Sequence, residues 1–266
     1  MGDFIKRLLS ALLLLPPVLF LIYKGGIYIN LIVGLVVVLC SIEYYRMLGF
    51  EKLSLIISVC LSLAAYSGLV FSNENDAVFI IIPVFILAGL YVLFTIKDIK
   101  GSALRVSYLF TGIIYTGIFP AFIPFIRNHD SEKGFYNLLT FLAVIWLSDT
   151  FAYFIGKSLG RHKLYEIVSP KKTIEGSLGG IAGGIAGVYI IALFFGKCPS
   201  LPFVLLAGVV VNLAGQAGDL FESMFKRDAG IKDSGNLIPG HGGMLDRVDA
   251  IIFSAPVMYL ILRFLL

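Results

Sequence analysis

Residues 77–96 read AVFIIIPVFILAGLYVLFTI, a run of 20 residues without one charged side chain. A helix needs about 20 mostly apolar residues to cross the hydrocarbon core of a bilayer. Similar runs recur from end to end, and their continuous rather than alternating character argues against transmembrane strands. The sequence predicts nine spans, at residues 5–23, 27–47, 52–72, 77–96, 103–126, 134–156, 174–196, 201–225 and 248–265.

The composition supports the same class of protein. The chain is 58% hydrophobic and 14% charged, with a mean hydropathy of +0.93, whereas soluble domains carry about 25% charged residues. We therefore predict an all-α, polytopic integral membrane protein with about nine transmembrane helices. The first run resembles a signal peptide, but no small-residue cleavage site follows Tyr23, so we expect a retained helix. The three cysteines lack paired spacing, which indicates neither a disulfide framework nor a zinc site.

The basic residues predict the orientation of these spans. With the N-terminus in the cytoplasm, 16 of the 21 lysines and arginines fall on the cytoplasmic side and 5 fall outside. Cytoplasmic loops carry the excess of basic residues in membrane proteins. We therefore expect a multi-pass protein of the cell (cytoplasmic) membrane whose active site faces the cytoplasm.

The two halves of the chain differ in character. Residues 1–130 hold five spans of mainly aliphatic and aromatic residues, and we expect a scaffold with a lipid-facing or dimer surface. Glu43 is the one acidic residue near a span interior there, and we interpret it as an ion pair with Arg46, one turn on. Residues 131–266 carry polar groups within four spans, and we expect the catalytic site in this half.

Small and polar residues give two of these later spans a helical pattern. In span 174–196, glycines recur every four residues in two registers, a spacing that lets helix backbones approach closely. In span 201–225, the polar residues step by 4, 3, 4 and 3 along one face: Asn212, Gln216, Asp219, Ser223 and Lys226. Asn212 and Gln216 suit hydrogen bonds between helices. A carboxylate in a membrane helix, such as Asp219, needs a partner or a water-filled cavity.

Three carboxylates predict a metal site. Asp246 and Asp249 share one face of the first turn of the last span, and the preceding span brings Asp219 to a similar depth. Like charges at one depth repel each other unless a cation joins them, and Mg²⁺ commonly binds one or two carboxylates together with substrate phosphates. The alternative is a set of ion pairs with neighbouring basic residues. Glu222, four residues before Lys226, has the favourable order for a helical ion pair.

A dense polar segment, Ser223–Asp249, reads SMFKRDAGIKDSGNLIPGHGGMLDRVD and contains eight charged residues, a histidine and five glycines. Its residue types suit a polyphosphate, because basic side chains and glycine-rich backbone both bind anions. The predicted phosphate-binding residues are Lys226, Arg227, Lys232, Gly240, His241, Gly242, Gly243 and Arg247. Upstream, Lys171 and Lys172 are expected to meet nucleotide phosphate or lipid head groups. Ser148 and Asp149 are two further polar residues, and they lie within the predicted span 134–156.

Other classes of protein fit less well. The sequence lacks a P-loop, a dinucleotide-binding glycine fingerprint and a zinc-protease HExxH motif. An ion-coupled transporter should place its charges near the midplane, often in repeated halves. Here the charges gather toward one end of the spans and no repeat is apparent.

The segment Ser223–Asp249 resembles the signature of the phosphatidate cytidylyltransferase (CDP-diacylglycerol synthase) family, bacterial type. The matching residues are Ser223, Lys226, Arg227, Lys232, Asp233, Gly235, Pro239, His241, Gly242, Gly243, Asp246, Arg247 and Asp249. The segments WLSDTFAYFIGK (residues 146–157) and SPKKTIEG (residues 169–176) also resemble that family. The resemblance is specific over residues 130–266 and general over the first half.

The resemblance implies that CTP and phosphatidic acid give CDP-diacylglycerol and pyrophosphate in phospholipid biosynthesis. It further implies Mg²⁺, a second, monovalent cation such as K⁺, a homodimer and no nucleic-acid partner. We expect Asp219, Asp246 and Asp249 to hold the metal, with Lys226, Arg227, Asp246, Asp249 and His241 in catalysis. The expected substrate-binding residues are Ser148, Asp149, Lys171, Lys172, Asn212, Ser223, Lys232, Gly242, Gly243 and Arg247. A CTP-dependent polyprenol or lipid kinase, which would release CDP, is the alternative enzyme.

Overall fold

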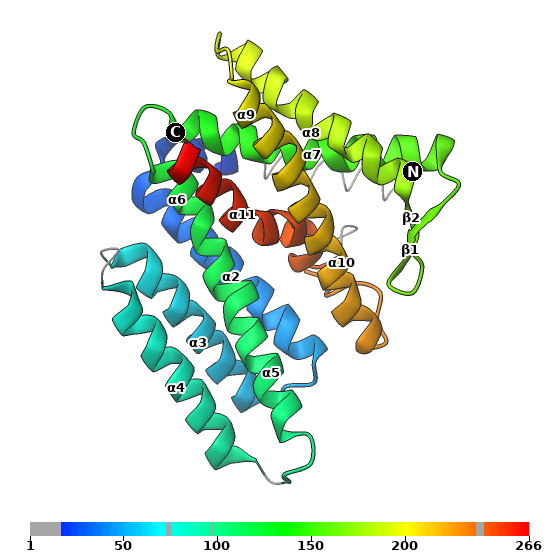
Figure 1. Ribbon diagram of the computed structural model, residues 1–266. Helices are drawn as coiled ribbons and strands as arrows, with labels where there is room; N and C mark the ends of the chain where they lie inside the picture. The colour runs from blue at the N-terminus through cyan, green and yellow to red at the C-terminus, as the bar shows by residue number, and fades with distance from the viewer. Residues whose placement is uncertain (1–16, 73–75, 97, 238–241, 266) are drawn as a thin grey trace. The chain divides into compact units, whose positions relative to one another are not determined.

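A computed structural model describes residues 17–72, 76–96, 98–237 and 242–265 (Figure 1). Within this part of the chain, eight helices are long and apolar enough to cross a membrane. They are Gly26–Met47, Lys52–Phe71, Ala77–Thr95, Ser102–Asn128, Gly134–Leu159, Ile174–Phe194, Leu201–Asp228 and Leu245–Leu265. These helices coincide with the second to ninth predicted spans and confirm an all-α, multi-pass membrane protein. Most of the predicted first span, 5–23, lies outside the described residues, so the count of nine and the orientation stay predictions.

The chain forms two compact units. The first contains Met1–Pro124 and Asp233–Arg247, and the second contains Phe125–Lys232 and Val248–Leu266. The described residues 233–237 and 242–247 of the signature segment thus belong to the same unit as the helices Gly26–Met47, Lys52–Phe71 and Ala77–Thr95. The predicted roles of 1–130 as scaffold and 131–266 as catalytic half concern function and stay predictions.

In the first unit, helices that follow one another in the chain pack side by side (Figure 1). Its elements are α2 (Gly26–Met47), α3 (Lys52–Phe71), α4 (Ala77–Thr95), α5 (Ser102–Gly112), the π-helical η1 (Ile113–Ile118), the 3-10 turn η2 (Phe119–Ala121) and the start of α6 (Phe122–Asn128). Glycines also permit close contacts between elements that are not consecutive: a Cβ built on Gly112 of α5 would lie 2.5 Å from the Tyr45 ring of α2, and one on Gly117 of η1 would lie 2.6 Å from the Ser62 carbonyl oxygen of α3.

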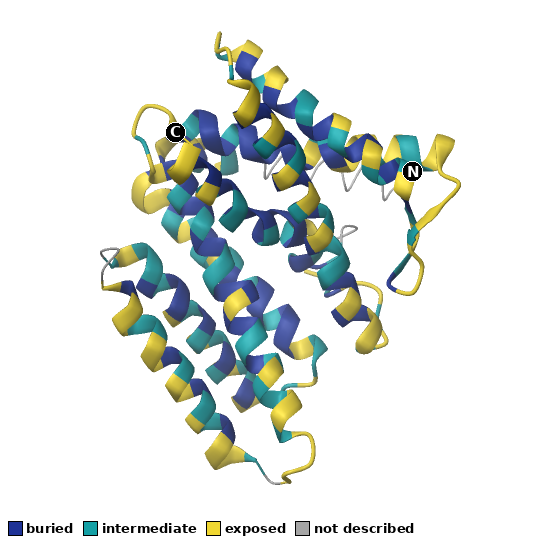
Figure 2. Ribbon diagram, in the orientation of Figure 1, coloured by how far each residue is buried: buried dark blue, intermediate teal, exposed yellow. Residues whose placement is uncertain are grey.

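In the first unit, apolar side chains are exposed on the outer surface, as a surrounding bilayer requires. Figure 2 marks long stretches of α4 as exposed or intermediate, and the exposed positions include Phe79 and Phe94. Polar groups lie inside instead, where the Tyr45 hydroxyl is 3.0 Å from Ser62 Oγ and donates to the Leu109 carbonyl over 3.2 Å. Apolar residues outside and satisfied polar groups inside suit a lipid-facing surface.

The second unit is built around glycine-rich α8. Its elements are α7 (Gly134–Leu159), α8 (Ile174–Phe194), α9 (Leu201–Leu205), the π-helical η3 (Leu206–Val211), α10 (Asn212–Asp228) and most of α11 (Leu245–Leu265). A Cβ on Gly183 would lie 2.4 Å from the Leu147 carbonyl oxygen on α7. On another face of α8, a Cβ on Gly184 would lie 2.5 Å from the carbonyl oxygen of Gly208 in η3. The prediction that these glycines permit close helix packing is confirmed.

A short antiparallel hairpin connects α7 to α8. Its strands are β1 (Lys163–Tyr165) and β2 (Ser169–Thr173), with Lys163 opposite Thr173 and Tyr165 opposite Ser169. The sequence predicted no strand here. The Glu175 carboxylate holds the base of this hairpin, because it accepts hydrogen bonds from the backbone N–H groups of Arg161 (3.1 Å) and His162 (3.2 Å).

Candidate functional site

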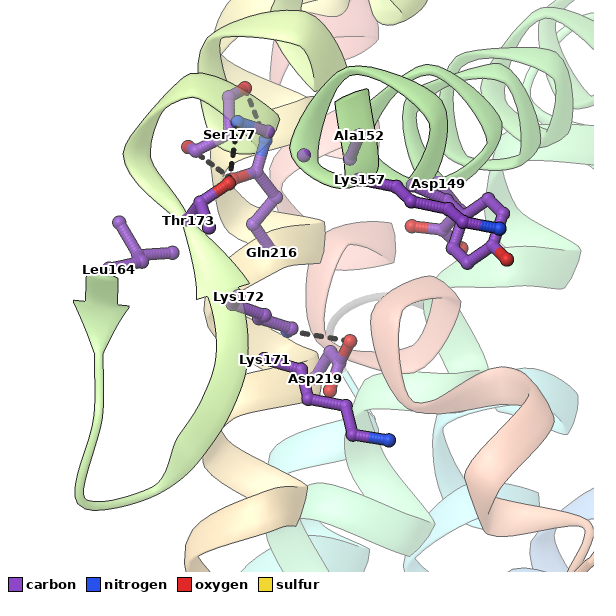
Figure 3. A pocket seen from close by; sticks show the side chains of 13 residues that line it. Asp149, Ala152, Lys157, Leu164, Lys171, Lys172, Thr173, Ser177, Gln216 and Asp219 are labelled. Atoms are coloured by element: carbon purple, nitrogen blue, oxygen red, sulfur yellow. Dashed lines mark hydrogen bonds and ion pairs between the residues drawn. The ribbon is translucent and has the colours of Figure 1, made fainter. Parts of the chain in front are cut away.

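A pocket of about 620 Å³ lies within the second unit, between α7, the hairpin, the start of α8 and α10 (Figure 3). Two acidic and three basic side chains line it together with apolar groups. The lining residues are Asp149, Ala152, Tyr153, Gly156, Lys157, Leu164, Lys171, Lys172, Thr173, Gly176, Ser177, Gln216 and Asp219. A cavity with apolar walls and a few convergent charges is typical of a small-molecule site.

The hairpin brings its two lysines to this pocket because β2 runs directly into α8. Thr173 ends the strand and caps the helix, its Oγ1 accepting a hydrogen bond from the Gly176 backbone N–H over 3.1 Å. Small residues make room for this cap: a Cβ on Gly160 would lie 2.8 Å from Thr173 Oγ1, and one on Gly156 would lie 3.1 Å from it. Lys171 and Lys172, immediately before the cap, are thereby held at the pocket.

The charges in the pocket come from three elements. Lys172 Nζ lies 2.6 Å from Asp219 Oδ2, so the hairpin and α10 form an ion pair across the pocket (Figure 3). Asp149 and Lys157, two turns apart on α7, also line it. The structure therefore brings together four residues that the sequence singled out: Asp149, Lys171, Lys172 and Asp219.

The polar stripe of α10 begins as a set of hydrogen bonds between helices. Asn212 is 1% exposed, and its Nδ2 donates to the Gly180 carbonyl over 2.6 Å. Gln216 Nε2 donates to Asn212 Oδ1 over 2.6 Å and to the Ser177 carbonyl over 3.2 Å. These contacts confirm the interhelical role predicted for both residues. Asn212 is absent from the pocket lining, and its predicted substrate contact stays untested.

The stripe then continues through residues that interact with one another. Ser223 Oγ donates to Asp219 Oδ1 over 3.3 Å. Lys226 is only 8% exposed, and its Nζ lies 2.5 Å from Glu222 Oε2, which confirms the predicted helical ion pair. A direct phosphate contact by Lys226, which stays a prediction, would require the buried ammonium to change partners.

Asp249 of α11 belongs to the second unit and faces the same part of α10. A Cβ on Gly218 would lie 2.9 Å from the Asp249 backbone oxygen, so the turn before Asp219 packs directly on the turn that contains Asp249. Asp249 is buried. The structure thus brings Asp219 and Asp249 to touching turns of two helices.

The remaining predicted residues of the second unit lie around this cluster. Arg227 connects the end of α10 to the hairpin, since its Nε donates to the Val168 carbonyl over 3.3 Å. Lys232 is exposed. Ser148 is buried, and its Oγ lies 3.0 Å from where a Cβ on Gly180 would be, so it packs on α8 outside the pocket lining.

Asp246 belongs to the first unit, where it organises the end of the signature loop. Its Oδ2 accepts hydrogen bonds from the Ser234 backbone N–H (2.9 Å), from Ser234 Oγ (3.0 Å) and from the Gly243 N–H (2.9 Å). Gly242 has a left-handed φ of 85°, which favours glycine at this turn. The Gly243 N–H, predicted to bind phosphate, already donates to this carboxylate. Arg247 is exposed, and His241 lies outside the described residues.

Glu43 is the residue whose position differs most from its prediction. It is 7% exposed, and no Glu43–Arg46 ion pair occurs within the described residues. Instead, its carboxylate accepts hydrogen bonds from the Met244 and Leu245 backbone N–H groups and from Ser234 Oγ. The pairing with Arg46 is therefore wrong, because the unsatisfied N–H groups at the start of α11 offer the buried carboxylate better partners. Spacing along one helix could not have indicated partners 200 residues away.

The predicted metal ligands were Asp219, Asp246 and Asp249. Among the residues that the structure describes, no group of three or more His, Cys, Asp or Glu side chains is arranged to hold a metal ion. The donor types nevertheless suit Mg²⁺, which takes hard oxygen ligands and commonly needs only one or two carboxylates when substrate phosphates complete its shell. Asp149 and Asp219 provide two carboxylates at the pocket. Joint binding by the three predicted ligands stays a prediction.

Several residues that line the pocket were not predicted from the sequence. Lys157 was included only as the last residue of the segment 146–157, yet it lies eight positions after Asp149 on α7 and shares the pocket with it. That interval equals about two helical turns and could have placed both residues on one face. Tyr153, one turn after Asp149 on α7, carried the same signal, whereas the place of Leu164 depends on how the hairpin folds.

Comparisons with known proteins agree along the whole chain. Residues 5–265 match the model of the Cytidylyltransferase family. A phosphatidate cytidylyltransferase of Synechocystis sp. is 35% identical over 291 residues, covering 96% of this chain and 94% of the relative. One from Staphylococcus epidermidis is 33% identical, covering 96% and 98%. One from Bacillus subtilis is 41% identical over 162 residues, covering 59% and 58%.

Proposed function

We propose that this chain, which belongs to the cytidylyltransferase family, is a membrane-embedded enzyme that makes CDP-diacylglycerol and pyrophosphate from CTP and phosphatidic acid. Relatives that match almost its whole length carry the name phosphatidate cytidylyltransferase. The observation that carries the proposal is the pocket of the second unit, where lysines and carboxylates meet apolar walls among membrane-spanning helices. Such a site suits a reaction between a charged nucleotide and a lipid phosphate.

The proposed reaction does not need a strong general base. A phosphate oxygen of phosphatidic acid attacks the α-phosphorus of CTP, a new P–O bond forms, and the bond to the β-phosphate breaks to release pyrophosphate. The nucleophile is already anionic, so the main barrier is the meeting of negative charges. Positioning and electrostatic stabilisation dominate phosphoryl-type transfers, and Lys157, Lys171 and Lys172 supply positive charge at the pocket.

The Lys172–Asp219 ion pair suggests that Lys172 binds a substrate phosphate and that Asp219 then binds a cation. An incoming phosphate would attract the Lys172 ammonium and leave the Asp219 carboxylate without its partner at 2.6 Å. That carboxylate, with Asp149 or Asp249 close by in the same unit, would then suit a cation. When bound, Mg²⁺ would neutralise phosphate charge on the substrate and on the departing pyrophosphate. A second, monovalent cation such as K⁺ is part of the same proposal.

The orientation and assembly of the protein are proposals of the same kind. The 16 to 5 distribution of basic residues supports a cytoplasmic N-terminus and a pocket that opens to the cytoplasm, where CTP is found. The relatives are bacterial, which supports the cytoplasmic membrane as the location. The resemblance to the family supports a homodimer.

Purified protein in detergent with phosphatidic acid and each of CTP, dCTP, ATP, GTP and UTP tests the proposal. We expect CDP-diacylglycerol and pyrophosphate in equal amounts with a cytidine nucleotide and Mg²⁺, and neither product without Mg²⁺. Release of CDP from CTP with a polyprenol acceptor would favour the kinase instead. Ion flux in liposomes without CTP turnover would favour a transporter.

A matched pair of hairpin variants tests the pocket itself. Lys172→Met removes the ammonium that pairs with Asp219, and we expect kcat/KM to fall about 100-fold, as for other lost electrostatic donors. Lys163→Met removes a lysine of the same hairpin whose Nζ donates to the Pro170 carbonyl and which does not line the pocket. Equal activity of the two variants would contradict the assignment of the pocket.

A further inference from the structure

We infer that Glu43 of α2 is a positioning residue for the signature loop: it fixes the start of α11 and, through Ser234, the carboxylate of Asp246. The inference rests on the proposed cytidylyltransferase function, because it assigns a role in that reaction. All the residues involved belong to the first unit. Glu43 lies outside the signature segment.

The first support is that Glu43 caps a helix to which it does not belong. Glu43 Oε1 lies 3.0 Å from the Met244 backbone nitrogen, and Oε2 lies 2.8 Å from that of Leu245. The first N–H groups of an α-helix have no partner within the helix, and its dipole favours a negative charge there. A buried carboxylate that accepts both N–H groups therefore fixes the position and direction of the first turn of α11.

The second support is that the loop has room for this carboxylate only because of two glycines. A Cβ on Gly235 would lie 2.5 Å from Glu43 Oε1, and a Cβ on Gly243 would lie 2.6 Å from Oε2. Both distances are well below van der Waals contact. Gly235 and Gly243 thus let the loop close around the Glu43 side chain, which gives these signature glycines a role other than phosphate binding.

The third support is a direct connection to Asp246. Ser234 Oγ lies 3.1 Å from Glu43 Oε2 and 3.0 Å from Asp246 Oδ2. Because a hydroxyl has one proton, Ser234 donates to one carboxylate at a time and keeps both close to it. Asp246 is a predicted metal and catalytic residue, so a change at Glu43 reaches the proposed chemistry through a single side chain.

The test compares Glu43→Gln and Glu43→Asp with a control on the same helix. Glutamine keeps the size of the side chain but replaces one acceptor oxygen with an NH₂ donor that would face a backbone N–H or Ser234. Aspartate keeps the charge but is shorter. Ser41→Ala is the control, since Ser41 is also buried on α2 and interacts with Thr116 Oγ1 at 2.7 Å, away from the loop.

Hydrogen exchange of the Met244 and Leu245 amides measures the capping without any substrate or metal. We expect exchange to become about 10- to 100-fold faster in Glu43→Gln, as for the loss of a hydrogen bond to a charged group, and to stay unchanged in Ser41→Ala. Partial protection is expected in Glu43→Asp. Unchanged exchange in Glu43→Gln would overturn the inference, whatever the enzyme assay shows.

Steady-state kinetics measure the consequence for the reaction. We expect Glu43→Gln to lower kcat about tenfold or more and to raise the Mg²⁺ concentration for half-maximal rate, with a smaller effect in Glu43→Asp. Faster exchange with unchanged kcat and Mg²⁺ dependence would reduce Glu43 to a structural cap and overturn its positioning role. If wild-type protein forms no CDP-diacylglycerol, the proposed function fails, while the exchange result still decides the capping. If Glu43→Gln does not fold, Ser234→Ala tests the link to Asp246 by the same readouts.

Discussion

Replacing Gly183 with alanine should destabilise the second unit by forcing α7 and α8 apart. The new Cβ would lie 2.4 Å from the Leu147 carbonyl oxygen, 2.9 Å from the Leu147 carbonyl carbon and 2.9 Å from Phe151 Cβ. Two of these neighbours are backbone atoms, so a change of rotamer cannot relieve the contact. Overpacking of this kind costs about 1–3 kcal/mol.

Gly89→Ala provides the matched control. Gly89 also lies inside a membrane-spanning helix, α4, but the nearest atom to its new Cβ would be 4.0 Å away, on the Phe110 ring. Both substitutions gain the same intrinsic helix propensity of alanine, about 1 kcal/mol over glycine. The difference between the two variants therefore isolates the collision at Gly183, which we expect to be about 1–3 kcal/mol.

Thermal unfolding in one detergent, followed by intrinsic fluorescence, is the assay. In a protein of this size, 1 kcal/mol shifts the midpoint by about 2–4 °C. We therefore expect Gly183→Ala to unfold roughly 2–12 °C below Gly89→Ala. Equal midpoints would mean that α7 and α8 do not touch at Gly183, and would refute the role given to the glycines of α8.

Further outcomes follow from other contacts. Gln216→Leu removes hydrogen bonds between α10 and α8 and should cost about 1–2 kcal/mol in the same unfolding assay; no change would contradict the interhelical role. Glu175→Ala leaves the His162 N–H at the hairpin base without its carboxylate, so limited proteolysis should cut the hairpin sooner than in wild type. Backbone N–H groups, that of Lys133 first, hold the pKa of Asp130 below its usual range. Its stabilising contribution is thus present above the pKa of the unfolded chain and lost as the pH falls below about 4, and Asp130→Asn should flatten the acid limb of stability against pH.

Hydropathy was sufficient to predict the eight spans within the described residues, because the bilayer imposes one length and one kind of surface on every crossing. The predicted run at 52–72 became α3 (Lys52–Phe71), and the run at 134–156 became α7 (Gly134–Leu159). The irregular turns η1 and η3 gave no such signal, because an apolar run reads the same whether its turns are α or π. The hairpin was likewise hidden, since Glu175 holds it from outside its own strands.

Contacts between residues that are close in the sequence could be predicted at the candidate site. Contacts between residues that are far apart in the sequence could not. Asp219 was singled out as a carboxylate that needed a partner, and Lys172 as a residue expected to meet phosphate or lipid head groups; the two form an ion pair. Their pairing with each other was not foreseen, because 46 residues, including the whole of α8, separate them. Glu43 was assigned to its nearest basic neighbour for the same reason: short spacing is visible in a sequence, and contacts across a fold are not.

The capping of α11 by Glu43 bears on the order in which the protein is made. Glu43 and its partner Ser234 are separated by 191 positions in the chain, so α2 leaves the ribosome long before the loop exists. Until the loop is synthesised, the Glu43 carboxylate has none of its loop partners, although it is buried in the folded protein. Closure of the loop is therefore a late assembly step. A fragment that began at residue 131 would retain every signature residue and still lack the acid that completes this step.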